Sequence, residues 1–423
     1  MTKKLLRHPV VKNAISLLTV QIAKYILPLV TIPYLARILG PQEWGLVIFA
    51  QVSAQWFEMI LDYGFNLSAT CEISRNRDNQ QQVTEIVSGV MGASGLLLVV
   101  STLIVLSMSI LVPAFKLHPD YLIWAWLIGV AQGLNPLWYF QAIERMQFQA
   151  MLDLGTRVIA TVITLMWVKT SNEGWKVLAV QATAGLLAYA SMLVLMYRDI
   201  PWQLPRIASA LKALRMGGSM FLYRCSVSLY TTANTFILGL LAPLQQIAFY
   251  GESQRLTRAV GTLSSPITQA IFPRISYLLT NNSKRAAKLA SISMLVMGLG
   301  SLSLAAMLAI FAPLIVNTLF GAKFEPAVPL LRILVFVLPF MSLNYVLGLQ
   351  WMLPLGLNRA FNSITITAGL INLILAPIFT LKFGTIGMAW MVVFSDAFVT
   401  IGIYIILWRK GLTIHHVWNT PLI

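Results

Sequence analysis

The chain has 423 residues, of which 58% are hydrophobic and only 10% are charged, and its mean hydropathy is +0.76. Soluble globular proteins carry roughly 25% charged residues, so this composition excludes a soluble fold and indicates a multi-pass membrane protein. The formal net charge of +16 could suggest a nucleic-acid partner, but the basic residues are spread along the chain, and we expect no nucleic acid.

Apolar segments long enough to cross a bilayer predict about twelve transmembrane helices. The predicted spans are residues 13–36, 44–67, 84–112, 121–142, 150–168, 176–197, 217–241, 248–276, 289–316, 329–353, 361–380 and 385–408. The expected fold class is therefore all-α and integral to the membrane.

Lysine and arginine are distributed unequally between the two sets of connecting segments. With twelve spans, eighteen of these residues fall on one side and seven on the other. Because cytoplasmic loops carry the excess of positive charge, both termini are expected in the cytoplasm.

The predicted spans divide into two six-helix halves, residues 1–203 and 217–423, joined by a cytoplasmic connecting helix at residues 204–216. In that connection Ile207, Leu211 and Leu214 share one side, which is typical of an amphipathic helix on the inner leaflet. A weak repeat supports the two halves, since a shift of 202 residues places Pro41 on Pro243. Six spans per half imply parallel repeats related by a pseudo-two-fold axis along the membrane normal, with a central cavity between the halves.

The eighth span carries a band of polar residues spaced about every three to four positions, which places them along one helix face. The band is Glu252, Arg255, Arg258, Thr262, Ser265, Gln269 and Ser276. Counted from Ala248, Arg258 lies roughly 15 Å into the bilayer, where a charge costs about 2.5–3.5 kcal/mol on insertion scales. Such a face should line a polar cavity rather than contact lipid.

Other spans also carry charged residues. The candidate substrate-binding cations are Lys24, Arg224, Arg255 and Arg258, and the candidate coupling-ion sites or charge partners are Glu58, Asp62, Glu252 and Asp396. Intramembrane ionisable groups usually serve function, but Lys24, Arg255 and Arg258 could instead be neutralised by Glu252, Asp396 or backbone carbonyls to fix packing. Arg224 lies near the inner end of its span and could extend its side chain to the interface. Asp153 and Arg157, four residues apart, predict an internal ion pair.

Motifs for chemistry and metal binding are missing from the sequence. Cys71 and Cys225 give neither a disulfide framework nor metal-ligand spacing, and no phosphate-binding loop or nucleophile elbow occurs. We therefore expect no catalytic residues, no metal site and no cofactor.

Four stretches carry a family resemblance. They are residues 27–51 (LPLVTIPYLARILGPQEWGLVIFAQ), 272–276 (FPRIS), 319–334 (LFGAKFEPAVPLLRIL) and 354–360 (PLGLNRA). Together they resemble the Wzx-type polysaccharide flippases, which export O-antigen repeat units and share the MOP superfamily with lipid II flippases and MATE pumps. The resemblance implies a non-enzyme that moves an undecaprenyl-diphosphate-linked oligosaccharide across the bacterial cytoplasmic (inner) membrane, from its inner to its outer leaflet. A polysaccharide polymerase and a chain-length regulator are further candidate partners.

The residues agree with this reading. An anionic diphosphate needs a cationic, water-filled path, and Lys24, Arg255 and Arg258 supply charges and forked donors for its oxygens. Asp62 and Asp396 could carry a coupling proton or sodium ion. A drug antiporter of related fold remains an alternative, although cationic drugs prefer an acidic lumen. A membrane polymerase or glycosyltransferase is another, although its long outer loops are missing.

Overall fold

The computed structural model describes the backbone of residues 9–420 and the side chains of residues 27–420, except 29, 147, 148, 223, 226, 227 and 229–231. Every regular element in this part of the chain is a helix. Seven helices or helix runs there are long and apolar enough to cross a membrane, and several contain breaks that divide them into shorter passes.

The longest helices each contain two predicted spans. α2 (Pro9–Asp62) is interrupted at Gly40, where φ is 74° and ψ is 172°. α17 (Asn358–Arg409) is interrupted at Gly384, where φ is 61° and ψ is −145°. Positive φ favours glycine because it has no Cβ, so each glycine marks the turn between two consecutive passes.

The remaining predicted spans also fall on helices. The other helical elements, in chain order, are α3 (Phe65–Arg75), α4 (Gln80–Leu111), α5 (Pro113–Leu117), α6 (Pro119–Gly133), α7 (Leu137–Ala142), α8 (Met146–Trp167), α9 (Gly174–Asp199), α10 (Ile207–Thr231), α11 (Ala233–Leu241), α12 (Leu244–Gly261), α13 (Ser264–Asn281), α14 (Ser283–Phe320), η1 (Ala322–Phe324), α15 (Ala327–Leu334), α16 (Val337–Leu343), η2 (Asn344–Met352) and α18 (Ile414–Asn419). The all-helical fold class is confirmed. The span predicted at 248–276 is two helices, however, because the chain breaks at Thr262 and Leu263 between α12 and α13.

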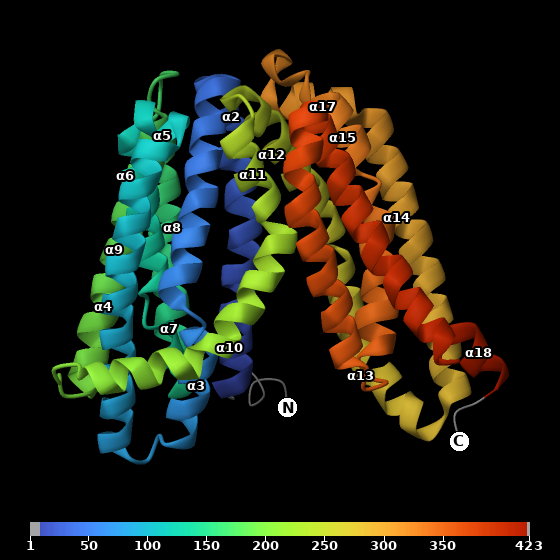
Figure 1. The fold of residues 1–423 in the computed structure, drawn as a ribbon, viewed down its shortest axis with the longest axis horizontal. Coiled ribbons are helices and arrows are strands. Elements are labelled where there is room, and N and C mark those ends of the chain that lie inside the picture. The colour runs from blue at the N-terminus through green and yellow to red at the C-terminus, as the bar shows by residue number, and fades with distance from the viewer. Residues whose placement is uncertain (1–8, 421–423) are drawn as a thin grey trace. The chain divides into compact units, whose positions relative to one another are not determined.

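The chain forms two compact units, with unit 1 ending at Cys225 and unit 2 beginning at Ser226. This boundary lies inside α10, so the predicted connecting segment and the start of the seventh span belong to one helix. In Figure 1 the first part of α10 runs crosswise to the long helices of unit 1. It packs closely on α4, since a Cβ added at Gly89 would lie 2.9 Å from the Ser209 carbonyl oxygen.

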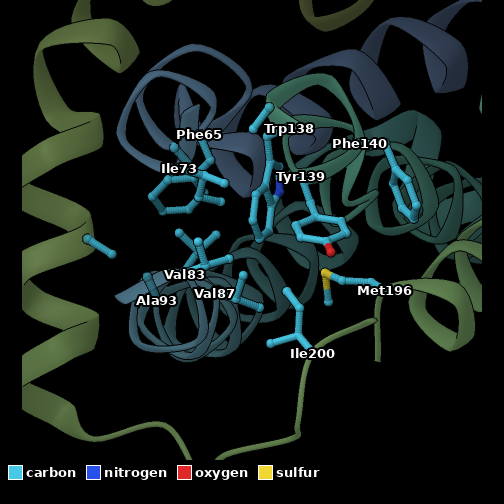
Figure 2. Close-up of a cluster of buried hydrophobic side chains, with 14 of the residues drawn as sticks. Phe65, Ile73, Val83, Val87, Ala93, Trp138, Tyr139, Phe140, Met196 and Ile200 are labelled. Atoms are coloured by element: carbon cyan, nitrogen blue, oxygen red, sulfur yellow. The ribbon is translucent and has the colours of Figure 1, made fainter. Parts of the chain in front are cut away.

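The core of unit 1 lies where α3, α4, α7 and α9 meet. Phe65, Val87, Trp138 and Met196 are buried there, and Figure 2 shows Trp138 in the middle of the cluster with Tyr139 on the side toward Met196 and Ile200. Aromatic and aliphatic side chains fill this region, so α3 and α7 are held against α4 and α9 by apolar packing.

A break in the second pass of unit 1 separates α2 from α3. Tyr63 and Gly64 both have positive φ, 44° and 80°. α10 packs directly on this break: a Cβ added at Gly64 would lie 2.6 Å from the Met220 Cβ, and the Tyr63 ring stacks on Phe221 at 4.5 Å between centroids. Glycine at position 64 therefore serves both the left-handed backbone and the close approach of α10.

The core of unit 2 is built around η2, a nine-residue π-helical segment. Trp351 is fully buried and donates a hydrogen bond to the Leu412 carbonyl oxygen at 2.8 Å. The short helix α18 packs against α14, burying Ile414 and Val417 in the same cluster. These contacts fix the carboxy-terminal segment to the end of unit 2 (Figure 1).

Candidate functional site

The band predicted on the eighth span lies on α12 and α13 of unit 2. The inner face of α12 is polar yet buried: Ser253 donates to the Ala327 carbonyl oxygen at 3.0 Å, and Thr235 of α11 donates to Gln254 at 3.0 Å. The opposite face carries Arg255 and Arg258. The polar residues of α12 thus form two faces, one that joins neighbouring helices and one that is open.

The two arginines lie deep in the span. Counted from Leu244, the first residue of α12, Arg255 is about 16 Å and Arg258 about 21 Å along the helix. The side chain of Arg255 is 40% exposed, and Arg258 is also exposed on unit 2. A guanidinium that faced lipid tails would be costly, so we expect the surroundings of both arginines to be polar.

Glu252 holds Arg255 in place. Its side chain is only 1% exposed, and its Oε1 accepts a hydrogen bond from Arg255 Nη1 at 3.0 Å. This is a geometry that residues three positions apart on a helix can reach. The buried carboxylate restricts the direction of the guanidinium while leaving part of it open.

A second ion pair lies in unit 1. Arg224 of α10 pairs with Asp62 of α2, whose side chain is 2% exposed while that of Arg224 is 32% exposed. Asp62 Oδ1 also accepts from the Asn66 backbone N–H at 3.3 Å across the Tyr63–Gly64 break. Arg224 is therefore held by a carboxylate, which differs from both the open cation and the interfacial cation considered from the sequence. The predicted Asp153–Arg157 pair is confirmed at 2.9 Å.

Asp396 lies in a polar cluster that the sequence analysis missed. Asn344, the first residue of η2, donates to the Asp396 carbonyl oxygen at 3.4 Å and to its Oδ1 at 3.5 Å. Thr400 donates to Asn344 Oδ1 at 2.8 Å. A lone amide within an apolar run, together with an acid on a neighbouring span, was the available signal.

Another missed cluster anchors the far end of η2. Gln350 is fully buried, accepts from Ser293 Oγ at 2.8 Å and donates to Thr268 Oγ1 at 3.2 Å. These contacts join η2 to α14 and α13, so both ends of the π-helical segment are tied to neighbouring helices by polar side chains.

Two predicted residues, Glu58 and Lys24, remain to be placed. Glu58 is half-buried, and α6 passes close to its backbone, since a Cβ added at Gly133 would lie 2.8 Å from the Glu58 carbonyl oxygen. The side chain of Lys24 is outside the described residues. Among described residues, the structure thus brings together Asp62 with Arg224 and Glu252 with Arg255.

Comparisons with known proteins identify relatives along nearly the whole chain. The profile of the family described as "Polysaccharide biosynthesis protein" matches residues 10–279. A protein named "Putative O-antigen transporter" from Escherichia coli (strain K12) is 31% identical over 395 residues, covering 92% of this chain and 94% of its own. A protein of the same name from Shigella dysenteriae is 24% identical over 397 residues, covering 92% and 98%.

Solved structures agree on the fold. The lipid II flippase MurJ in an inward closed conformation matches with a TM-score of 0.67 at 12% identity, covering 96% of this chain and 93% of that one. An outward-facing multidrug resistance MATE family transporter of the MOP superfamily matches with a TM-score of 0.52 at 15% identity, with 95% of each chain covered. The resemblance stated from four short stretches is confirmed. With these matches, the chain belongs to the polysaccharide biosynthesis protein family and has the fold of the multi-pass MOP-superfamily transporters.

Proposed function

We propose that this protein is a flippase that moves an undecaprenyl-diphosphate-linked oligosaccharide, an O-antigen repeat unit, from the inner to the outer leaflet of the cytoplasmic membrane by alternating access. The family, the O-antigen transporter names of its relatives and the fold shared with a lipid II flippase support a polysaccharide-precursor flippase. The protein is a transporter rather than an enzyme.

The observation that carries the proposal is the open arginine face of α12. Arg255 and Arg258 are about one helical turn apart on α12, and within unit 2 Arg255 is half-buried while Arg258 is exposed. Guanidinium groups form forked hydrogen bonds that match phosphate oxygens, and such charge-assisted bonds strengthen where water is scarce. A diphosphate passing this face would be paired at a depth where it otherwise could not be solvated.

Glu252 orients the Arg255 side chain in this site. Because its carboxylate is buried and bonded to Arg255, the guanidinium loses less side-chain freedom on binding a phosphate. Glu252 is thus a positioning residue, and Arg255 and Arg258 are the groups that contact the headgroup. On α13 the exposed Gln269 lies among the exposed apolar Ile267 and Phe272, a mixture suited to an amphipathic lipid.

The alternatives fit this face less well. An antiporter for cationic drugs would present carboxylates on the open face, whereas here the carboxylate of Glu252 is buried and the arginines are exposed. A polymerase or glycosyltransferase would need acid or base side chains on long outer loops. The connection between α8 and α9 is only residues 168–173, and that between α11 and α12 is residues 242–243.

Coupling to an ion gradient is part of the proposal. Either Asp62, held by Arg224, or Asp396, bonded by Asn344, would take up a proton or sodium ion during transport. Asparagine at each position, assayed with and without each gradient, tests this. Full gradient-dependent transport by both variants would exclude them as coupling sites.

Both termini and the start of α10 are proposed to be cytoplasmic, from the lysine and arginine asymmetry. Reporter fusions placed after Arg215 and at the carboxy terminus should be active only in the cytoplasm. External activity at either point would reverse this orientation.

The central experiment removes the cations and measures surface polysaccharide at matched protein abundance. Arg255→Ala, Arg258→Ala and Lys24→Ala should each lower export, and lipid-linked single repeat units should accumulate in the inner leaflet. Arg255→Lys and Arg258→Lys should be milder, since the charge remains without the fork.

The matched control is Arg332→Ala, which removes an exposed arginine on α15 of the same unit and should leave export unchanged. Normal export from a stable triple variant lacking Lys24, Arg255 and Arg258 would refute the headgroup assignment. Accumulation of unpolymerised units outside the cell would indicate a polymerase instead.

A further inference from the structure

One end of unit 2 gathers a set of exposed cations, which we name the basic end surface. Its members are Arg274, Lys284, Arg285, Lys288, Arg359, Arg409 and Lys410. Each lies within two residues of a member of the single hydrophobic cluster that contains Ile275, Ala286, Leu357 and Leu407. Asn282 joins α13 to α14, and the turn at Gly384 brings the first and last residues of α17 to the same end of the unit. This is also the end where α18 packs on α14 (Figure 1).

This surface has no carboxylate of its own. From Ser264 to the end of the chain the sequence contains only two acidic residues, Glu325 and Asp396. Glu325 follows the opposite end of α14, and Asp396 lies midway along the second pass of α17. Within the described part of the chain, none of the seven cations forms a salt bridge.

In unit 1, by contrast, several cations are paired with carboxylates. Arg77 pairs with Glu144 at 3.4 Å, Arg145 with Asp199 at 3.2 Å, and Arg157 with Asp153 at 2.9 Å. A preference for cations on one side of the membrane would be met equally by paired and unpaired residues. The lack of carboxylate partners for these seven cations among the described residues therefore points to an external anion.

The neighbouring side chains indicate what that anion is. Tyr277, Trp408 and Trp418 are large, exposed and interleaved with the cations, and the Arg274 guanidinium lies 5.7 Å from the centre of the Tyr277 ring. Tyrosine and tryptophan concentrate at the boundary between bilayer and water. Asn282 alone joins α13 to α14, so Lys284 and Arg285 cannot extend far from the helix ends. We therefore expect these cations to lie at the level of the lipid headgroups.

We propose that the basic end surface binds the phosphate headgroups of anionic phospholipids in the leaflet that it meets. Several lysines and arginines near an anionic membrane attract it additively, and the attraction decays within a Debye length. A soluble acidic protein fits less well, because the exposed Tyr277, Trp408 and Trp418 beside the cations are side chains typical of the boundary between bilayer and water. This binding is separate from transport of the lipid-linked substrate and does not depend on it.

The test uses the purified full chain in detergent, without any lipid-linked substrate. Phosphatidylglycerol is titrated in, phosphatidylcholine serves as the uncharged comparator, and inorganic phosphate serves as the free anion. Bound lipids are counted by native mass spectrometry, and the thermal unfolding midpoint is followed in parallel. The variant is K284Q/R285Q/K288Q. The matched control is R77Q/R145Q/R157Q, which removes the same charge from paired positions in unit 1.

We expect phosphatidylglycerol, but not phosphatidylcholine or inorganic phosphate, to bind and raise the unfolding midpoint. At roughly fivefold per cation, K284Q/R285Q/K288Q should weaken this association about a hundredfold. The control should retain most of it, and the α10 cations Arg206, Lys212 and Arg215 contribute equally in both proteins. Equal losses in the two variants would show a response to net charge alone and overturn the proposal. Tight binding of inorganic phosphate would overturn it as well, since a lipid surface would not then be required.

Discussion

Replacing Arg224 by alanine should destabilise unit 1, because Asp62 would stay buried without its guanidinium. Removing one partner of a fully buried ion pair costs about 3–5 kcal/mol. The Arg224 side chain is 32% exposed, so water already screens part of the interaction, and we reduce the expected cost to about 2 kcal/mol. That corresponds to a factor of about 30 in the ratio of folded to unfolded protein.

A second variant separates the buried charge from lost packing. In Arg224→Ala/Asp62→Asn both charges are gone, so most of the lost stability should return. The control is Arg157→Ala, which breaks an exposed pair with Asp153 on α8 and should cost under about 0.5 kcal/mol.

The assay is thermal unfolding of the purified chain together with surface polysaccharide at matched abundance. About 2 kcal/mol should lower the unfolding midpoint by about 4–8 °C, using the scaling for domains of comparable size. If the double variant is as unstable as Arg224→Ala, charge burial is not the cause. If Arg224→Ala unfolds normally but exports poorly, Arg224 contacts the substrate instead of holding Asp62.

Three further predictions follow from local geometry. Gly64→Ala should destabilise the protein more than Gly40→Ala, although both positions have positive φ. The new Cβ would lie 2.6 Å from Met220 Cβ at position 64, whereas at position 40 it would meet nothing within 4 Å. Equal thermal midpoints would contradict the packing described for α10. Gln350→Leu should lower the free energy of unfolding by about 1–2 kcal/mol, because Ser293 and Thr268 lose their buried hydrogen-bond partner. Adding Ser293→Ala should recover part of that loss. If it does not, the loss comes from packing rather than from the unpaired hydroxyl. In the turn before α9, the hydrogen bond from the Lys169 backbone N–H, with a further one from Lys176, lowers the pKa of Glu173 to about 2 from its ordinary 4.5. The stabilising effect of Glu173 is therefore complete above pH 4.5 and lost as the pH falls toward 2. Hydrogen exchange of this turn should show that loss, and Glu173→Gln should remove the pH step.

Sequence reasoning located the spans because a bilayer demands about 20 consecutive apolar residues, a signal carried by each segment alone. It missed the break between α12 and α13, although Gly261 and Pro266 lie on either side of it and Pro266 cannot donate a helical hydrogen bond to the Thr262 carbonyl oxygen. A Cβ added at Gly261 would lie 2.6 Å from Met341 Sδ, so α16 presses against α12 at this point. Nothing within residues 248–276 reveals that contact.

Of the ion pairs, the one within a single helix was predictable from the sequence and the one between two helices was not. Arg157 and Asp153 are four residues apart on one helix, so helical geometry predicts their contact. The Arg224–Asp62 pair joins α10 to α2, and predicting it requires the rotation of each helix about its axis. The role of Lys24 as a substrate cation stays a prediction, and so do the headgroup roles of Arg255 and Arg258.

The π-helical segment η2 has a consequence for how relatives of this chain align. A π-helical turn closes its hydrogen bonds one residue later than an α-helical turn, so it holds one extra residue without changing where the helix ends. Asn344 and Gln350 bond to neighbouring helices at its two ends, which keeps the surplus residue inside the segment. A relative whose tenth span is a plain α-helix should therefore be one residue shorter between positions 344 and 352. An alignment forced through this span without a gap would assign every residue beyond it to the wrong helix face.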